Sequence, residues 1–153
     1  MNVSRWTSAL AIVGLMVSAA AAQQPGVRAM NPDQVKMAVQ GICPVSGNKL
    51  GTHGQPIKVK LGEEVLFLCC QGCTKQRVNP QHWATIHANF ARAQGICPIM
   101  KKPLPKSPKW TVVNGQLIYT CCPPCGKKLQ SDPAAAVAQL NALYQQSLST
   151  RQR

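Results

Sequence analysis

The sequence predicts an α+β protein built from two small tandem repeats, each with a cysteine-proline loop, a β-hairpin and helices. The first observation is an internal repeat: the segment QGICP at 40–44 returns at 94–98, and CCQGC at 69–73 returns as CCPPC at 121–125. The second is a pair of short extended runs before each double cysteine. The third is an Asn-Pro or Asp-Pro dipeptide after it, which is typical of a helix start.

The repeat also predicts the organisation of the chain. We expect one repeat at 40–93 and a second at 94–148, because the landmarks occur in the same order in both segments. A lead segment, 23–39, precedes them, with a short helix expected over 35–39. Residues 149–153 form a tail.

Residues 1–22 are typical of a secretory signal peptide. Arg5 gives a basic start, 6–22 are uncharged and mostly apolar, and the run ends in alanines. An uncleaved membrane anchor is the alternative, but a run this short is at the lower limit for crossing a bilayer. We therefore expect cleavage near Ala22 and a mature chain without a membrane span, located in the periplasm or secreted.

The extended runs form two predicted hairpins. In the second repeat the runs 110–113 and 116–119 are joined by Asn114-Gly115, the preferred centre of a type I′ turn. In the first repeat the runs 57–61 and 65–68 are joined by the residues Gly-Glu-Glu. Each second strand leads directly into the double cysteine.

Two helices are predicted to follow Asn79-Pro80 and Asp132-Pro133, with Asn79 and Asp132 as N-caps. Both have apolar side chains at spacings of three and four, a pattern that indicates a face packed on a core. These side chains are Trp83, Ile86 and Phe90 in the first helix, and Val137, Leu140, Leu143 or Tyr144, and Leu148 in the second. Because a repeat of this size has a thin core, we expect a cross-link or a metal to support it.

The net charge of +13 comes from 17 Lys+Arg against 4 Asp+Glu. Solubility is the ordinary role of such a charge. The basic residues are scattered and the aromatic ones few, which argues against nucleic-acid binding. Positive charge also favours a cluster of anionic sulfur atoms. No acid–base pair or Ser/His/Asp set stands out, so we do not expect an enzyme.

All eight cysteines belong to the repeated pattern. A helix start and nearby basic side chains stabilise thiolate, the form that binds soft metal ions. Lys75, Arg77, Lys127 and Lys128 follow the cysteine clusters closely. We therefore predict one thiolate-rich site per repeat, for Zn²⁺ or Cu⁺. The candidate ligands are Cys43, Cys69, Cys70, Cys73, Cys97, Cys121, Cys122 and Cys125.

Two other uses of the cysteines remain open. An exported chain with an even cysteine count is a candidate for disulfides, although adjacent cysteines rarely bond to each other. Such a chain would be a disulfide-stapled binding module. The two C-x-x-C spacings also fit a periplasmic thiol-disulfide oxidoreductase, but the βαβ pattern of a thioredoxin fold is absent.

The cysteine pattern, with an apolar-aromatic strand before each pair and an Asn/Asp-Pro helix after it, resembles the TRASH and YHS group of small heavy-metal-binding domains. The resemblance implies a treble-clef-like fold in each repeat and a role in metal handling, sensing or resistance. By position it assigns ligand roles to Cys43, Cys69, Cys73, Cys97, Cys121 and Cys125.

The chain departs from that group at two positions. Members with a Cys-Pro-x-Cys loop carry a second cysteine where this chain has Ser46 and Met100, and Cys70 and Cys122 are candidates to replace it. A Met thioether also suits Cu⁺. Among the histidines, His53 is the best candidate for an auxiliary ligand.

Together these observations predict an exported protein for metal carriage, buffering or resistance. Its partners would be metal ions and a metal transporter or efflux protein.

Overall fold

The structure is a computed structural model that describes residues 30–153, so the predicted signal peptide lies outside the described residues. Within that range the chain has a mixed α+β fold with four α-helices, one short 3-10 helix and two separate two-stranded antiparallel hairpins. No helix in this range is long and apolar enough to cross a membrane. The elements are α1 (Pro32–Gln40), β1 (Ile57–Leu61), β2 (Glu64–Leu68), η1 (Gln71–Lys75), α2 (Pro80–Gln94), β3 (Lys109–Val113), β4 (Gln116–Thr120), α3 (Pro123–Ser131) and α4 (Pro133–Arg151).

Both predicted hairpins are confirmed, with strands that differ from the predicted ones by at most one residue at an end. In the second hairpin Val113 pairs with Gln116 across the turn. Asn114 and Gly115 have φ values of 49° and 74°, the left-handed pair that a type I′ turn requires. In the first hairpin Leu61 pairs with Glu64 around Gly62, whose φ is 62°.

The predicted helix starts are also confirmed. The Asn79 side chain accepts a hydrogen bond from the Gln81 N–H at 2.8 Å, and the Asp132 side chain accepts one from the Ala135 N–H at 3.0 Å. The short helix expected over 35–39 is the longer α1, which Asn31 caps. These caps satisfy N–H groups that have no partner inside the helix.

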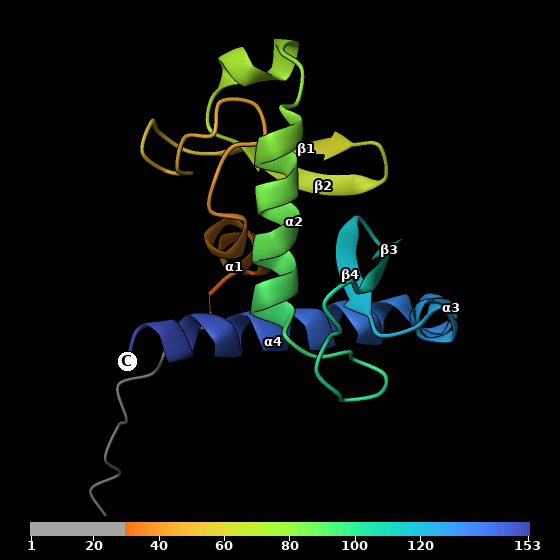
Figure 1. The fold of residues 1–153 in the computed structure, drawn as a ribbon. Coiled ribbons are helices and arrows are strands. Elements are labelled where there is room, and N and C mark those ends of the chain that lie inside the picture. The colour runs from red at the N-terminus through yellow and green to blue at the C-terminus, as the bar shows by residue number, and fades with distance from the viewer. Residues whose placement is uncertain (1–29) are drawn as a thin grey trace, which may run out of the picture.

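One main hydrophobic core contains residues from both halves of the chain, 40–93 and 94–148. This differs from the two thin cores expected from the sequence. Figure 1 shows the arrangement: α2 stands across α4, and both hairpins lie on the same side of α2. Ile86, Phe90 and Leu140 are at most 1% exposed, and Tyr144 rather than Leu143 is the buried residue beside them. Its ring stacks on Phe90 with centroids 5.9 Å apart.

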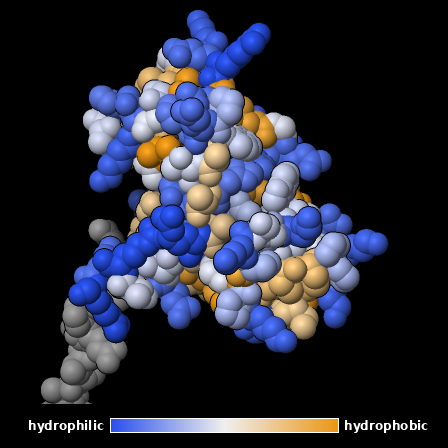
Figure 2. All heavy atoms as spheres, in the orientation of Figure 1, coloured by the Kyte–Doolittle hydropathy of each residue, from blue (hydrophilic) through white to orange (hydrophobic). Residues whose placement is uncertain are grey.

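The two halves share a core because the helices that end at Gln40 and Gln94 also lead directly into the next cysteine-proline loop. Gln40 ends α1 and Gln94 ends α2, and in both cases a glycine with positive φ turns the chain into the next cysteine-proline loop. Helix α2 therefore closes the first half and leads into the second. Hydrophilic residues cover most of the face seen in Figure 2, in keeping with the high net charge.

Candidate metal centres

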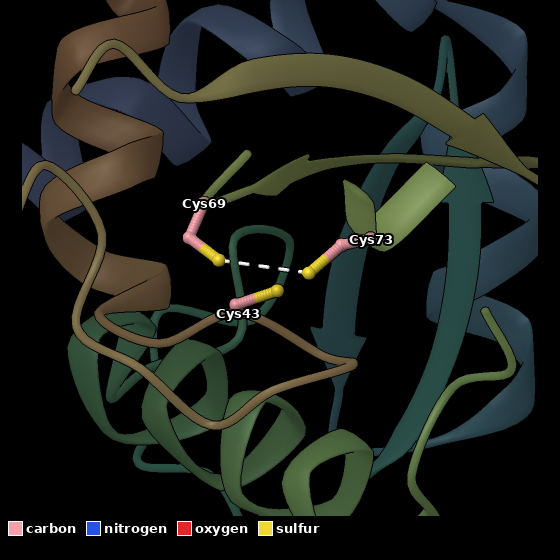
Figure 3. A group of neighbouring side chains, drawn as sticks. All are labelled: Cys43, Cys69 and Cys73. Atoms are coloured by element: carbon pink, nitrogen blue, oxygen red, sulfur yellow. Dashed lines mark hydrogen bonds between the residues drawn. The ribbon is translucent and has the colours of Figure 1, made fainter. Parts of the chain in front are cut away.

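Three cysteines from distant segments meet in the first half. Cys43 lies in the loop after α1, Cys69 follows β2 directly, and Cys73 lies in η1. Their Sγ atoms are within 4.8 Å of one another, and those of Cys69 and Cys73 are 3.6 Å apart. The three sulfur atoms point toward one another in Figure 3. All three residues are at most 5% exposed, so this group, the first triad, is shielded from water.

The second half brings together Cys97, Cys121 and Cys125 in the same way. Their Sγ atoms also lie within 4.8 Å of one another, with Cys121 and Cys125 3.8 Å apart. Cys97 and Cys125 are buried, whereas Cys121 is half-buried. This second triad is therefore closer to solvent than the first.

Both triads have the chemistry and spacing of a metal site. All eight cysteines are free of disulfide bonds. Four sulfurs arranged tetrahedrally at the usual zinc–sulfur distance lie about 3.8 Å apart, and three in a plane about 4.0 Å. The distances of 3.6 and 3.8 Å inside the triads match these values closely. Each triad is positioned to hold a metal ion.

A buried glutamine holds each cysteine-proline loop against the strand that leads to the double cysteine. The Gln40 amide donates to the Phe67 carbonyl at 2.7 Å and to the Ile42 carbonyl at 2.9 Å, and its oxygen accepts from the Phe67 N–H at 2.9 Å. Gln94 makes the same three bonds to Tyr119 and Ile96. Sequence reasoning missed this role, although a glutamine begins the repeated segment in both places.

The loops are shaped by their own backbone. In the first loop the Cys43 N–H donates to the Asn48 carbonyl at 2.8 Å, and the Gly47 N–H donates to the Cys43 carbonyl at 3.0 Å. In the second loop Cys97 makes the corresponding bonds to Lys102 and Lys101. Lys101 stands where the first loop has Gly47 and adopts a positive φ of 55°. The same turn therefore forms in both loops, at a conformational cost in the second.

The sulfur atoms of the first triad differ in acidity. Burial raises the pKa of Cys43, but hydrogen bonds from the backbone of Ser46, Cys69 and Val45 and from the Ser46 hydroxyl outweigh it and lower the pKa to about 6. Burial and the neighbouring thiols raise the pKa of Cys73 to about 12. One sulfur is thus ready to bind as thiolate, and a cation would have to displace the protons of the others.

The second triad has the same pattern. Burial raises the pKa of Cys97, but hydrogen bonds from the backbone of Met100, Cys121 and Ile99 lower it overall. The contact with Cys122, together with burial, raises the pKa of Cys125. In both triads the cysteine of the Cys-Pro loop is the most acidic thiol.

The two remaining cysteines lie beside the triads rather than in them. Cys70 Sγ is 3.8 Å from Cys69 Sγ and 3.7 Å from Cys73 Sγ, and the side chain is half-buried. Cys122 Sγ is 3.8 Å from Cys121 Sγ and 3.1 Å from Cys125 Sγ. Each is placed at the rim of its triad, within reach of two of its sulfurs.

The other residues singled out in the sequence have different places. The Ser46 hydroxyl lies 3.3 Å from Cys69 Sγ and so touches the first triad. Met100, at the corresponding position, is 48% exposed and outside the second triad. His53 is exposed and outside the first triad. His82 contacts the Val45 carbonyl through Nδ1 at 3.2 Å and so supports the first loop.

The TRASH/YHS resemblance stays a prediction, since no family model, no curated protein and no solved structure matches this chain.

Proposed function

We propose that the chain is an exported, non-enzymatic metal-binding protein that carries or buffers Zn²⁺ or Cu⁺, with one ion per sulfur triad. The convergence of three cysteines from distant segments, twice, is the observation that carries this proposal. Thiol groups held this close gain little from one another, whereas thiolates held this close repel unless a cation lies between them.

The number of sulfurs at each site favours a transferable ion. Each triad supplies three sulfurs, and Cys70 or Cys122 lies at its rim. Structural zinc sites are closed by four protein ligands, while sites that exchange a ligand keep a position open. Three buried sulfurs with the half-buried Cys70 in the first half, and two buried sulfurs with the half-buried Cys121 and Cys122 in the second, fit an ion that arrives and leaves. Soft thiolate ligands suit both Zn²⁺ and Cu⁺.

The remaining parts of the proposal rest on the sequence. We include a treble-clef-like fold in each of two repeats, membership of the TRASH/YHS group, and a location in the periplasm or outside the cell. A metal transporter or efflux protein is the expected partner. The assignment of repeats is supported by contacts that recur at corresponding positions. The Gln40 and Gln94 side chains make the same hydrogen bonds in the two halves, and the two cysteine-proline loops form the same turn.

The test is the metal content of protein purified with its thiols reduced. We expect about two ions of Zn²⁺ or Cu⁺ per chain, and free thiols that become titratable only after chelation. Cys43→Ser should reduce the content to one ion and Cys43→Ser/Cys97→Ser to none. Fully reduced, folded protein that takes up neither ion would contradict the proposal.

Thiol–disulfide exchange at Cys122 and Cys125 is a second candidate, because their Sγ atoms are only 3.1 Å apart. It predicts reduction of insulin disulfides by the wild-type protein and loss of that activity in Cys122→Ser. An inactive wild-type protein would exclude it.

A further inference from the structure

A groove lies beside the second triad, between the β3–β4 hairpin and α3. Its volume is about 320 Å³. No cysteine lines the groove, but Thr120 immediately precedes Cys121 and Pro123 immediately follows Cys122, so its wall is joined to the double cysteine through the backbone. Among the residues that line it are Lys109, Trp110, Thr111, Thr120, Lys127 and Gln130; we call this space the α3 groove.

The first half has a space at the corresponding place that differs from the α3 groove at three matched positions. It measures about 220 Å³ and lies against Cys73. Val59, Leu68 and Val78 line it together with Lys60, Thr74 and Gln76. The residues 52 positions after the three apolar ones line the α3 groove and are Thr111, Thr120 and Gln130. The α3 groove therefore has hydroxyl and amide groups at three positions where the first space has apolar side chains, and the Gln130 amide donates to the Thr111 hydroxyl at 3.4 Å.

The charge of the α3 groove is positive. Lys109 and Lys127 line it, neither forms an ion pair within residues 30–153, and no acidic residue lines it. Thr120 is 1% exposed, so a hydroxyl-bearing side chain is buried in the wall. Trp110 is 54% exposed and adds a flat apolar surface. Two ammonium groups with nearby hydrogen-bonding side chains suit a carboxylate ligand.

We propose that the α3 groove binds a small organic di- or tricarboxylate that brings the metal ion to the second triad or takes it away. The delivery role rests on the proposed function, while the binding of the carboxylate does not. The groove is lined by eight residues from one hairpin and one helix, which suits a small molecule better than an extended peptide. Carboxylate oxygens bind Zn²⁺, so such a ligand can hold the ion next to Cys121 and Cys122.

The first experiment measures citrate binding to metal-free, reduced protein by nuclear magnetic resonance at low ionic strength. We expect shifts at Thr111, Thr120 and Gln130, and binding about tenfold weaker in Lys109→Ala/Lys127→Ala, since each lysine supplies a charge-assisted contact. Thr111→Val/Gln130→Val, which introduces first-half residues and keeps the charge, should also weaken binding.

Lys60→Ala/Lys75→Ala is the matched control. It removes the same charge from the first half, where Lys60 lines the smaller space and Lys75 corresponds to Lys127. We expect it to bind citrate like the wild type. An equal loss in this variant, or shifts scattered over the basic surface, would show general charge attraction and overturn the proposal. Binding of an acidic peptide but not of citrate would overturn it too.

The second experiment separates this inference from the proposed function. Loading from a Co²⁺–citrate complex, followed by the thiolate-to-cobalt absorption, should be slower in Lys109→Ala/Lys127→Ala than in the wild type, with the same final metal content. If the wild type and the variant load at equal rates to full metal content, the delivery role alone is contradicted. If folded wild-type protein takes up no metal but still binds citrate, the carboxylate site stands, and both the delivery role and the proposed function are contradicted.

Discussion

The three cysteines of the first triad differ sharply in pKa. Cys43 receives hydrogen bonds from three backbone positions and from Ser46, which favour its thiolate, while Cys73 is buried among other thiols that favour the neutral form. The Cys69 pKa is also raised: the Ser46 hydroxyl and Cys73 lower it, but burial and the Cys43 and Cys70 thiols outweigh them. Metal affinity at this site should therefore depend on pH in steps, because binding displaces whatever protons remain.

We predict that the apparent affinity of the first triad changes slope near pH 6. Above about pH 6 Cys43 is already ionised, so binding displaces two protons and affinity falls about 100-fold per pH unit of acidification. Below that pH a third proton must leave and the fall becomes about 1000-fold per unit. Competition titrations in the Cys97→Ser background measure this, and Ser46→Ala should move the break to higher pH. A single slope from pH 5 to 8 would contradict the prediction.

A second residue-scale prediction concerns Lys36, which is 2% exposed. Its Nζ donates to the Gly115 carbonyl at 3.1 Å and lies 5.8 Å from the Phe90 ring centroid. Burial lowers its pKa from 10.5 to about 8, with Glu64 opposing the shift. Since the unfolded chain then holds this proton more tightly, the charge destabilises the fold below pH 8, and stability recovers as pH rises toward 10.5.

The expected change is a gain of up to about 3 kcal/mol in the free energy of unfolding between pH 8 and 10.5, relative to Lys36→Met. Urea unfolding of both proteins at the two pH values measures it, and the variant subtracts the titration of the cysteines. Parallel pH dependence in the two proteins would refute the prediction.

At the scale of elements, each cysteine-proline loop is joined to its hairpin by one buried amide. Gln40 is fully buried and bonds both the loop and the strand β2, and Gln94 does the same for β4. Without the amide, the Phe67 N–H and carbonyl or their Tyr119 counterparts lose a partner inside the protein. Buried groups left unpaired cost about 1–3 kcal/mol each.

We therefore predict that Gln40→Leu destabilises the protein by about 3 kcal/mol or more and weakens metal binding at the first triad, while the second triad still fills. Gln94→Leu should weaken metal binding at the second triad, while the first triad still fills. Gln145→Leu, on the exposed side of α4, is the control and should change neither property. Denaturant unfolding and metal content check the three variants. Equal metal loss at both triads in Gln40→Leu would show that the Gln40 amide does not act on the first triad alone.

For the whole molecule, the main core and the sulfur triads are largely separate. The main core contains no cysteine, and the first triad belongs to a smaller cluster with Leu68. The halves are also tied by backbone contacts: the Val65 N–H donates to the Gly115 carbonyl at 2.8 Å. A β-carbon on Gly115 would lie 2.6 Å from Val65 Cγ2, so the two hairpins meet closely there.

Removal of metal should accordingly loosen the triads without unfolding the protein. We predict that a chelator leaves the far-ultraviolet circular dichroism nearly unchanged and increases hydrogen exchange at 43–50, 69–78 and the corresponding second-half segments. Amides of α2 and α4 in the main core should keep their protection. Cooperative unfolding on chelation would show that the ions carry the fold.

Local patterns predicted both hairpins and the starts of α2 and α4. Asn114-Gly115 predicts its turn because few residues other than glycine and asparagine readily adopt positive φ, and Asn79-Pro80 predicts its helix start because the cap and the ring act within a few residues. Likewise, the doubled cysteine spacing predicted eight ligands, of which the structure brings six together in the two triads.

Only the tertiary structure decided how these helices and hairpins pack against one another. Sequence spacing did not show that the halves share one core, that Cys70 and Cys122 lie at the rim of the triads, or that Lys36 and Glu64 are buried. Each of these depends on contacts between residues far apart in the chain, such as Lys36 with Gly115. Short-range backbone preferences act within a few residues and are written in the local sequence, whereas burial and sulfur–sulfur distances arise only when distant segments pack together.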